Sequence, residues 1–153
     1  MSSLVPNIAK GRFAELYNRV DTGDPAAARL YVIPIQAGAV TDATLVDADD
    51  FAAMVTAGVT ERTANGWNRK TLTSADLALL APDDTNDRMP IDIADQSWTP
   101  TNAADTVSDL VVCYASVASP TNAQLVPLVV VDYVVTPSGA TEVANINDLA
   151  RAS

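Results

Sequence analysis

The chain of 153 residues contains no histidine and only one cysteine, Cys113. Without histidine, Ser-His-Asp and Cys-His catalysis and zinc sites of the Cys/His type are excluded, and a single cysteine excludes an intramolecular disulfide. Cys113 lies in the apolar run DLVVCYASV, where a thiol usually behaves as a small buried hydrophobic group. Most common hydrolase mechanisms are therefore excluded.

Basic residues are also scarce, with nine Lys and Arg against nineteen Asp and Glu, and the net charge is −10. Nucleic-acid binding depends mainly on Lys and Arg that neutralise phosphates, so we expect no direct DNA or RNA partner. No polybasic stretch is present that would attract an anionic membrane surface. The partners that remain are proteins, cations and neutral ligands.

Long apolar runs and targeting signals are missing as well. No run approaches the roughly 20 apolar residues that a membrane-spanning helix needs, so we expect no membrane association. The first residues, MSSLVPNIAKGRF, lack the basic and then apolar regions of a secretory signal. We therefore expect synthesis in the cytoplasm of the producing cell, with assembly from there.

The six glycines form no phosphate-binding loop, no dinucleotide-binding fingerprint and no G-x-S-x-G motif. Sixteen of the nineteen acids are aspartate, and any two of them could be nominated as a catalytic pair. None is singled out by an accompanying Glu on an apolar strand or by a Lys/Arg cluster. We therefore expect no catalytic residue, no cofactor and no enzymatic activity.

The length predicts one domain spanning residues 1–153, with a helix-containing part over about 1–80. Asn7 and Asp47 are predicted to cap the first two helices, and the third begins with a capping-box spacing at Thr73. Pro34, within the first predicted strand, favours an edge position, because a missing N–H does no harm there. Helices are predicted over about 7–20, 47–57 and 73–80, and strands over 30–35 and 66–72.

The second part of the chain, about 88–147, is rich in strand signals. Two runs are nearly continuous in β-branched residues and predict central strands covered on both faces, with Pro127 marking either a bulge or the start of pairing in the second. Together the two parts predict an α+β fold, mainly β: an antiparallel β-sandwich or partial barrel with two or three short helices from the N-terminal half on one face or edge. The predicted strands cover 89–93, 110–117, 125–135 and 141–147.

The stretch APDDTNDRMPIDIADQSW concentrates five aspartates and an asparagine within thirteen positions. A calcium loop of the EF-hand type that starts at Asp83 needs Gly at its sixth position and Glu at its twelfth. These positions hold Arg88 and Ala94, so the match fails. The composition is instead typical of a turn that leads into a strand, although an irregular cation site of Asp83, Asp84 and Asp87 stays open.

Aromatic and terminal residues are the candidates for contacts with neighbouring molecules. The two tryptophans each stand beside a turn with polar neighbours, so either could be exposed at an interface, where Trp is enriched, or could close one end of the core, the interpretation that we favour. The chain ends are the other candidates, because termini fray unless they pack against something. The predicted interface residues are Phe13, Tyr17, Trp67, Trp98, Leu149 and Arg151.

Three segments carry a resemblance: KGRFAELYNRVDTGDPAAARLYVIP, then GWNRKTLTSADLALLAPDDTNDRMPIDIADQSWT, then DLVVCYAS with LVPLVVVDYVVTPSGA. In their order along the chain and in their residues, these segments resemble a group of small structural proteins of tailed bacteriophages. The resemblance covers about two-thirds of the chain. None of the matching residues forms a catalytic motif. The most specific matches are W-N-R-K-x-L at 67–72, D-D-T-N-D-R at 83–88 and D-x-x-W-T at 95–99.

The resemblance implies a non-enzymatic virion protein, namely a capsid decoration or cement protein on the outer surface of the head shell. Its implied partner is the major capsid protein or another virion protein, and such proteins commonly act as homo-oligomers. Two alternatives stay open. One is a tail, neck or baseplate component; the other is a carbohydrate- or receptor-binding module, in which Trp67, Trp98 and Tyr114 would gather in one exposed cleft.

Overall fold

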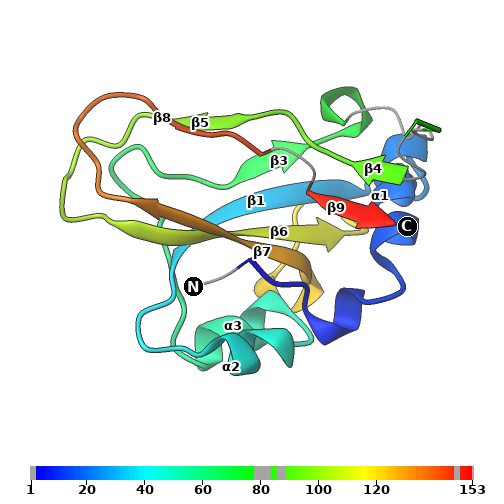
Figure 1. Ribbon diagram of the computed structural model, residues 1–153, viewed down its shortest axis with the longest axis horizontal. Helices are drawn as coiled ribbons and strands as arrows, with labels where there is room; N and C mark the ends of the chain where they lie inside the picture. The colour runs from blue at the N-terminus through cyan, green and yellow to red at the C-terminus, as the bar shows by residue number, and fades with distance from the viewer. Residues whose placement is uncertain (1–2, 78–83, 86–88, 147–148, 153) are drawn as a thin grey trace.

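The computed structural model describes residues 3–77, 84–85, 89–146 and 149–152. Its central strands are β1 (Arg29–Gln36), β2 (Thr60–Glu61), β3 (Lys70–Leu72), β6 (Val107–Ala115) and β7 (Val126–Val135). They form a five-stranded antiparallel sheet in the order β2-β1-β6-β7, with β3 paired to β1 on the same side as β2 (Figure 1). Strands from both parts of the sequence therefore share one sheet.

Two short antiparallel ribbons lie above this sheet in Figure 1. The ribbons pair β4 (Met89–Ile91) with β9 (Ala150–Ala152), and β5 (Gln96–Trp98) with β8 (Glu142–Ala144). The α-helices are α1 (Phe13–Thr22), α2 (Asp42–Val46) and α3 (Phe51–Thr56), and the 3-10 helices are η1 (Asn7–Ala9), η2 (Ser74–Asp76) and η3 (Asn122–Gln124). Helix α1 packs on the ribbon side of the sheet, whereas α2 and α3 cover the opposite face. The predicted α+β class, mainly β, is confirmed, but the helices lie on both faces.

The first predicted helix is divided into two. Helix η1 ends at Ala9, and α1 begins at Phe13 after a turn in which Gly11 has a φ of 78°. Asn7 therefore caps no α-helix, and its amide Nδ2 donates to Asp47 Oδ1 at 2.7 Å instead. The apolar face of α1 is buried, and the helix ends at a left-handed Gly23, both as predicted. The buried residues of this face are Phe13, Leu16, Tyr17 and Val20.

The other two predicted helices are shorter than expected. Asp50 caps α3 in place of Asp47, since its Oδ1 accepts the Ala53 N–H at 2.7 Å. The capping box at η2 is confirmed: the N–H and Oγ1 of Thr73 both donate to Asp76 Oδ2 at 2.8 Å, but η2 is a single 3-10 turn. The remainder of that predicted helix lies outside the described residues. None of the described helices has the length and apolar character to cross a membrane.

Strand β1 is central, so the prediction that Pro34 marks an edge is wrong. The strand pairs with β6 along one side and with β3 and then β2 along the other. The Pro34 carbonyl accepts the N–H of Arg62 at 2.9 Å, one residue beyond the end of β2. The N–H and C=O of one residue point to the same side of an antiparallel strand. The N–H that Pro34 lacks would therefore face the side of β2, just past the end of that strand, and no hydrogen bond to β6 is lost.

Strands β6 and β7 correspond to the two β-branched runs. Strand β6 is buried on both faces, as predicted. Strand β7 is buried on both faces only in its first half and then alternates, leaving Asp132 and Val134 exposed. The register with β6 shifts beside Pro127, where a bulge was predicted. The prediction of a central strand is therefore correct for β6, whereas β7 ends the sheet.

Buried apolar side chains form two clusters on opposite faces of the sheet. The upper cluster lies between the sheet, the ribbons and α1, and the lower cluster lies between the sheet and helices α2 and α3 (Figure 1). The upper cluster includes Tyr17, Leu30, Trp67, Ile93, Trp98, Leu110 and Leu128. The lower cluster includes Ile33, Leu45, Phe51, Met54, Val111, Cys113 and Val130. Cys113 is fully buried, as its apolar surroundings predicted.

Candidate functional site

The two tryptophans of the W-N-R-K-x-L and D-x-x-W-T motifs meet in the upper cluster. Their ring centroids are 5.5 Å apart, and Trp67 is 1% and Trp98 2% exposed. Each indole N–H is satisfied within the chain. Trp67 Nε1 donates to the carbonyl of Asp105 at 2.9 Å, and Trp98 Nε1 donates to that of Asn68 at 2.8 Å. The core interpretation is confirmed, and the interface alternative is wrong for both residues, because neither indole has surface to offer a partner.

The basic residues of the first motif also make contacts within the chain. Lys70 Nζ lies 5.4 Å from the ring centroid of Trp98. Arg69 turns to the other side, where Nε and Nη2 donate to the Glu61 carboxylate at 2.5 and 2.6 Å. Its Nη2 also donates to Asn122 Oδ1 at 2.7 Å. The hydrogen bonds to Glu61 raise the pKa of Arg69. Because the same guanidinium binds both Glu61 and Asn122, it connects β2 to η3.

Gly66 allows the two motif segments to touch. Its φ is 94°, and a Cβ at this position would lie 2.2 Å from the carbonyl oxygen of Thr99. A side chain therefore cannot be added without moving the backbone of the second motif. Asp95, which opens that motif, accepts the N–H of Ile146 on Oδ1 at 3.0 Å. The described residues of the two motifs thus build one structural framework.

The interface predicted at the chain ends requires correction. Phe13 and Leu149 are each 8% exposed, Tyr17 is 0% exposed, and all three belong to the upper cluster. The Tyr17 hydroxyl also donates to the carbonyl oxygen of Asp92 at 2.5 Å. These side chains fill the core of their own chain and so offer no surface to a neighbour. The side chain of Arg151 lies outside what the structure describes.

The acidic stretch shows no metal site in the part that is described. Asp83 and Asp87 of the irregular cation site lie outside the described residues, whereas Asp84 is exposed. Among residues 3–77, 84–85, 89–146 and 149–152, no three His, Cys, Asp or Glu side chains are placed to hold a metal ion. Asp84 and Thr85 lie in a turn, as predicted, and the rest of that predicted turn is not described.

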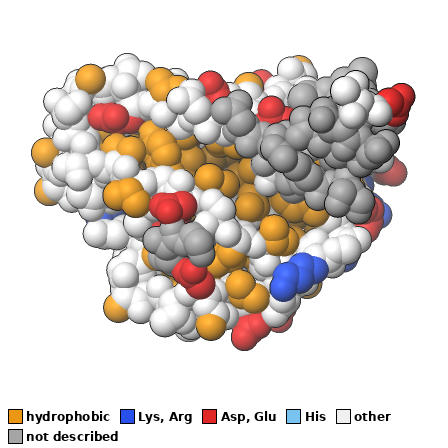
Figure 2. All heavy atoms as spheres, in the orientation of Figure 1, with side chains coloured by type: hydrophobic (Ala, Val, Ile, Leu, Met, Phe, Trp, Pro, Cys, Tyr) orange, Lys and Arg blue, Asp and Glu red, His pale blue; other side chains and the backbone are white. Residues whose placement is uncertain are grey.

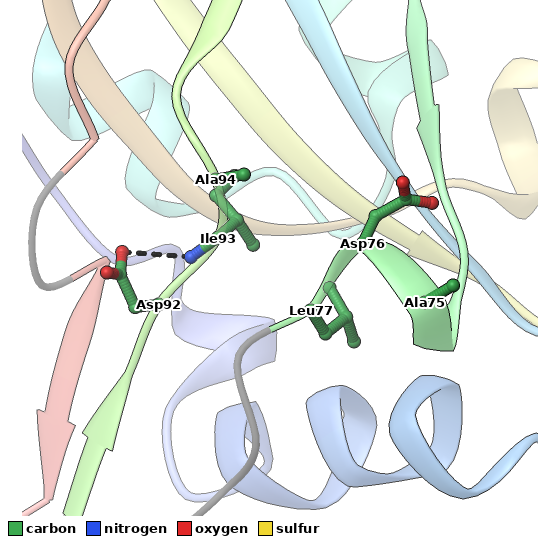
Figure 3. A pocket seen from close by; sticks show the side chains of 6 residues that line it. All are labelled: Ala75, Asp76, Leu77, Asp92, Ile93 and Ala94. Atoms are coloured by element: carbon green, nitrogen blue, oxygen red, sulfur yellow. Dashed lines mark hydrogen bonds between the residues drawn. The ribbon is translucent and has the colours of Figure 1, made fainter.

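An open pocket of about 440 Å³ lies between η2 and the segment that follows β4 (Figure 3). Its two carboxylates lie on opposite sides and do not point toward each other. Hydrogen bonds from the Thr73 N–H and then the Thr73 hydroxyl lower the pKa of Asp76, and Asp92 Oδ1 accepts the N–H of Ile93 at 2.9 Å. A general acid working near neutral pH needs a raised pKa, so Asp76 has the opposite shift. The pocket is lined by Ala75, Asp76, Leu77, Asp92, Ile93 and Ala94.

The sequence reasoning missed a buried acid, Asp109. Its side chain is fully buried and Ser108 Oγ donates to its Oδ2 at 2.6 Å, whereas its Oδ1 has no hydrogen-bond partner among the described residues. Burial is the main cause that raises its pKa; the Ser108 hydrogen bond opposes the shift, and the charges of Asp132 and Asp42 add to it. The available signal was alternation, which places Asp109 on the same face of β6 as Val111.

No protein-family model, curated protein or solved structure matches the chain. Its own geometry therefore defines the class: a strongly acidic α+β domain, mainly β, in which the residues of the distinctive motifs are structural.

Proposed function

We propose that the chain is a non-enzymatic structural protein of a tailed-phage virion and that it decorates the outer surface of the head shell. The proposal starts from the three segments that resemble small phage structural proteins. The observation that supports it best is that the motifs around Trp67 and Trp98, far apart in sequence, meet in one buried framework. Distinctive residues that serve architecture and not reaction suit a protein whose role is to be a rigid part of an assembly.

The charge is consistent with this location. A net charge of −10 disfavours contact with the phosphates of packaged DNA, so a protein surface is the better partner. We propose the major capsid protein as that partner, with many copies bound to a repeating lattice. Each copy then needs only a modest interface, because simultaneous contacts multiply weak affinities.

Copy number and position in purified particles test this proposal. Decoration predicts roughly hundreds of copies per particle, all on the head, because the shell presents its sites in symmetric repeats. Quantitative mass spectrometry gives the copy number, and labelled antibody seen by electron microscopy gives the position. A single ring of copies, or copies confined to the tail, would instead indicate a neck, tail or baseplate component.

The cement role has its own test. Particles prepared without the protein are expected to release DNA at a lower temperature, and after milder osmotic shock, than complete particles. Release is followed with a dye that fluoresces on free DNA, and adding purified protein back is expected to restore the stability. Heads that are equally stable with and without the protein would contradict a cementing role. The carbohydrate-binding alternative receives no support from geometry, since Trp67, Trp98 and Tyr114 are all buried.

A further inference from the structure

Residues 3–9, here called the strap, lie along the outer edge of β7 (Figure 1). Leu4 pairs with Val130, and the N–H of each residue donates to the carbonyl of the other at 2.9 Å. Ser3 Oγ accepts the N–H of Asp132 at 3.1 Å. Because the inner edge of β7 pairs with β6, the strap adds one antiparallel bridge at the outer edge of the sheet.

The strap contacts both faces of the sheet as well as its edge. Leu4 packs against the lower cluster and Val5 against the upper cluster, and both are half-buried. Ala9 is fully buried, and Asn7 Nδ2 donates to Asp47 Oδ1 at 2.7 Å. The edge of β7 and its surroundings, here called the seat, therefore match this particular segment through backbone bonds, apolar contacts and a side-chain bond.

The strap joins the rest of the chain through a turn with room to change direction. Residues 10–12 separate η1 from α1, and Gly11 in this turn has a φ of 78° with nothing within 4 Å of a Cβ built on it. These are the properties of a hinge that permits exchange between copies.

Charge distinguishes the strap from the body to which it is attached. Residues 1–12 hold two of the nine basic residues, Lys10 and Arg12, and none of the nineteen acids, so the remainder of the chain carries −12. Two acids, Asp47 and Asp132, border the seat. In Figure 2 acidic side chains likewise surround the apolar surface in the middle of this face. The strap itself contains no acid, so it adds no like-charge repulsion of its own when it approaches the acidic seat of another copy.

We propose that copies of this chain exchange straps, so that residues 3–9 of one copy occupy the β7 seat of a second copy. Exchange keeps the hydrogen bonds and apolar contacts that the strap makes within one copy and adds a link between two copies. The occupant is a second copy because the seat already fits this sequence. This inference goes beyond the proposed function, since it concerns the contact between copies and not the shell to which they bind.

Two single-cysteine variants test the exchange in the full chain. Ser3→Cys places a thiol on the strap and Asp132→Cys places one on the seat, where the Ser3 hydroxyl oxygen is 3.1 Å from the backbone nitrogen of residue 132. The natural Cys113 does not interfere, because it is fully buried and burial raises the pKa of its thiol. The two variants are mixed, oxidised gently and separated on a non-reducing gel.

Exchange predicts disulfide-linked pairs from this mixture, at least about tenfold more than from a control mixture of Ser138→Cys with Asp132→Cys, because the seat raises the effective concentration of the two thiols. Linked pairs at the control level would overturn the proposal. A disulfide formed within one chain of the double variant Ser3→Cys/Asp132→Cys would then show that each strap stays on its own body. Circular dichroism of the reduced variants checks that all of them fold.

Discussion

The upper and lower clusters differ in how they treat buried polar groups. In the upper cluster the indole N–H groups of Trp67 and Trp98 and the hydroxyl of Tyr17 all donate to backbone carbonyls. On the lower face of the sheet, Asp109 buries a carboxylate oxygen that has no partner. An unmade hydrogen bond costs more than a made one contributes. We therefore expect the upper cluster to give the molecule its rigid framework, and the lower face to carry a charge that lowers stability.

One motif residue links the two regions. Arg69 follows Trp67 in sequence, but its guanidinium lies 5.5 Å over the ring of Phe51, a member of the lower cluster. Its carboxylate partner, Glu61, is mostly buried, with 14% of its side chain exposed. Substitutions on the two sides of the sheet, and at this link, should therefore have effects of different size.

The largest expected effect comes from Gly66→Ala. A Cβ there would meet the carbonyl oxygen of Thr99 at 2.2 Å, and the backbone φ of 94° strains any L-residue. Since backbone must move in the packed framework, we expect the free energy of unfolding to fall by about 4 kcal/mol. Urea denaturation followed by tryptophan fluorescence measures the loss.

The matched control for this substitution is Gly58→Ala, next to the lower cluster. Gly58 also has a positive φ, of 113°, but the nearest atom to an added Cβ is Val40 Cγ2 at 3.5 Å, an ordinary van der Waals contact. We expect the strain alone, about 1–2 kcal/mol. Equal losses for the two alanines would mean that the close approach of the two motifs is not what makes Gly66 necessary.

The next largest loss of stability is expected at Arg69, which links the two clusters. We expect Arg69→Met to lower the free energy of unfolding by about 2–3 kcal/mol, less than for a fully buried pair because a quarter of the arginine side chain is exposed. A double-mutant cycle with Glu61→Gln should give a coupling of about 1–2 kcal/mol. The exposed pair of Arg19 with Glu15 is the control, and its cycle should give no measurable coupling. Additive effects at Arg69 and Glu61 would contradict the link.

The elements that sequence predicted well are those whose signal is local and repeated. The β-branched runs fixed β6 and most of β7, and helical spacing identified the buried face of α1. The break before α1 was missed, because a single Gly11 inside a helical pattern is compatible with a continuous helix. The prediction for Pro34 was wrong, because a central strand tolerates this proline only where the neighbouring strand β2 has ended. No local sequence pattern specifies where β2 ends.

The candidate sites were harder to predict, because they depend on pairings across the chain. The tryptophans were placed in the core by a weak preference, but their contact across 31 sequence positions has no signal in either motif. The strap pairs Leu4 with Val130, which lies far away in sequence. The sequence signal for this segment is the absence of acids in the first twelve residues. The unpaired carboxylate oxygen of Asp109 follows from packing alone.

The smallest predicted effect sharpens the contrast between the two faces, because it depends on pH. Asp109 has a pKa raised above its ordinary value of 3.8, mainly by burial. As pH falls from 7 through that raised pKa, the folded chain takes up a proton before the unfolded chain does, so the wild type gains stability relative to Asp109→Asn. At pH 7 we expect Asp109→Asn to be more stable than wild type by about 1 kcal/mol, since it removes a buried charge.

Asp76, on the ribbon side of the sheet, should make stability depend on pH in the opposite direction. Hydrogen bonds from Thr73 lower the pKa of Asp76 below 3.8, so its contribution is present above that value and is lost as pH falls through the lowered pKa. The free energy of unfolding should be measured by denaturation from pH 7 down to about pH 2. Above pH 3.8, the stability of the wild type should rise relative to that of Asp109→Asn as the pH falls. Below pH 3.8, the wild type should lose its extra stability over Asp76→Asn. If Asp109→Asn and the wild type instead kept a constant difference across this range, Asp109 would have the same pKa in the folded and unfolded chain, and burial on the lower face would not raise it.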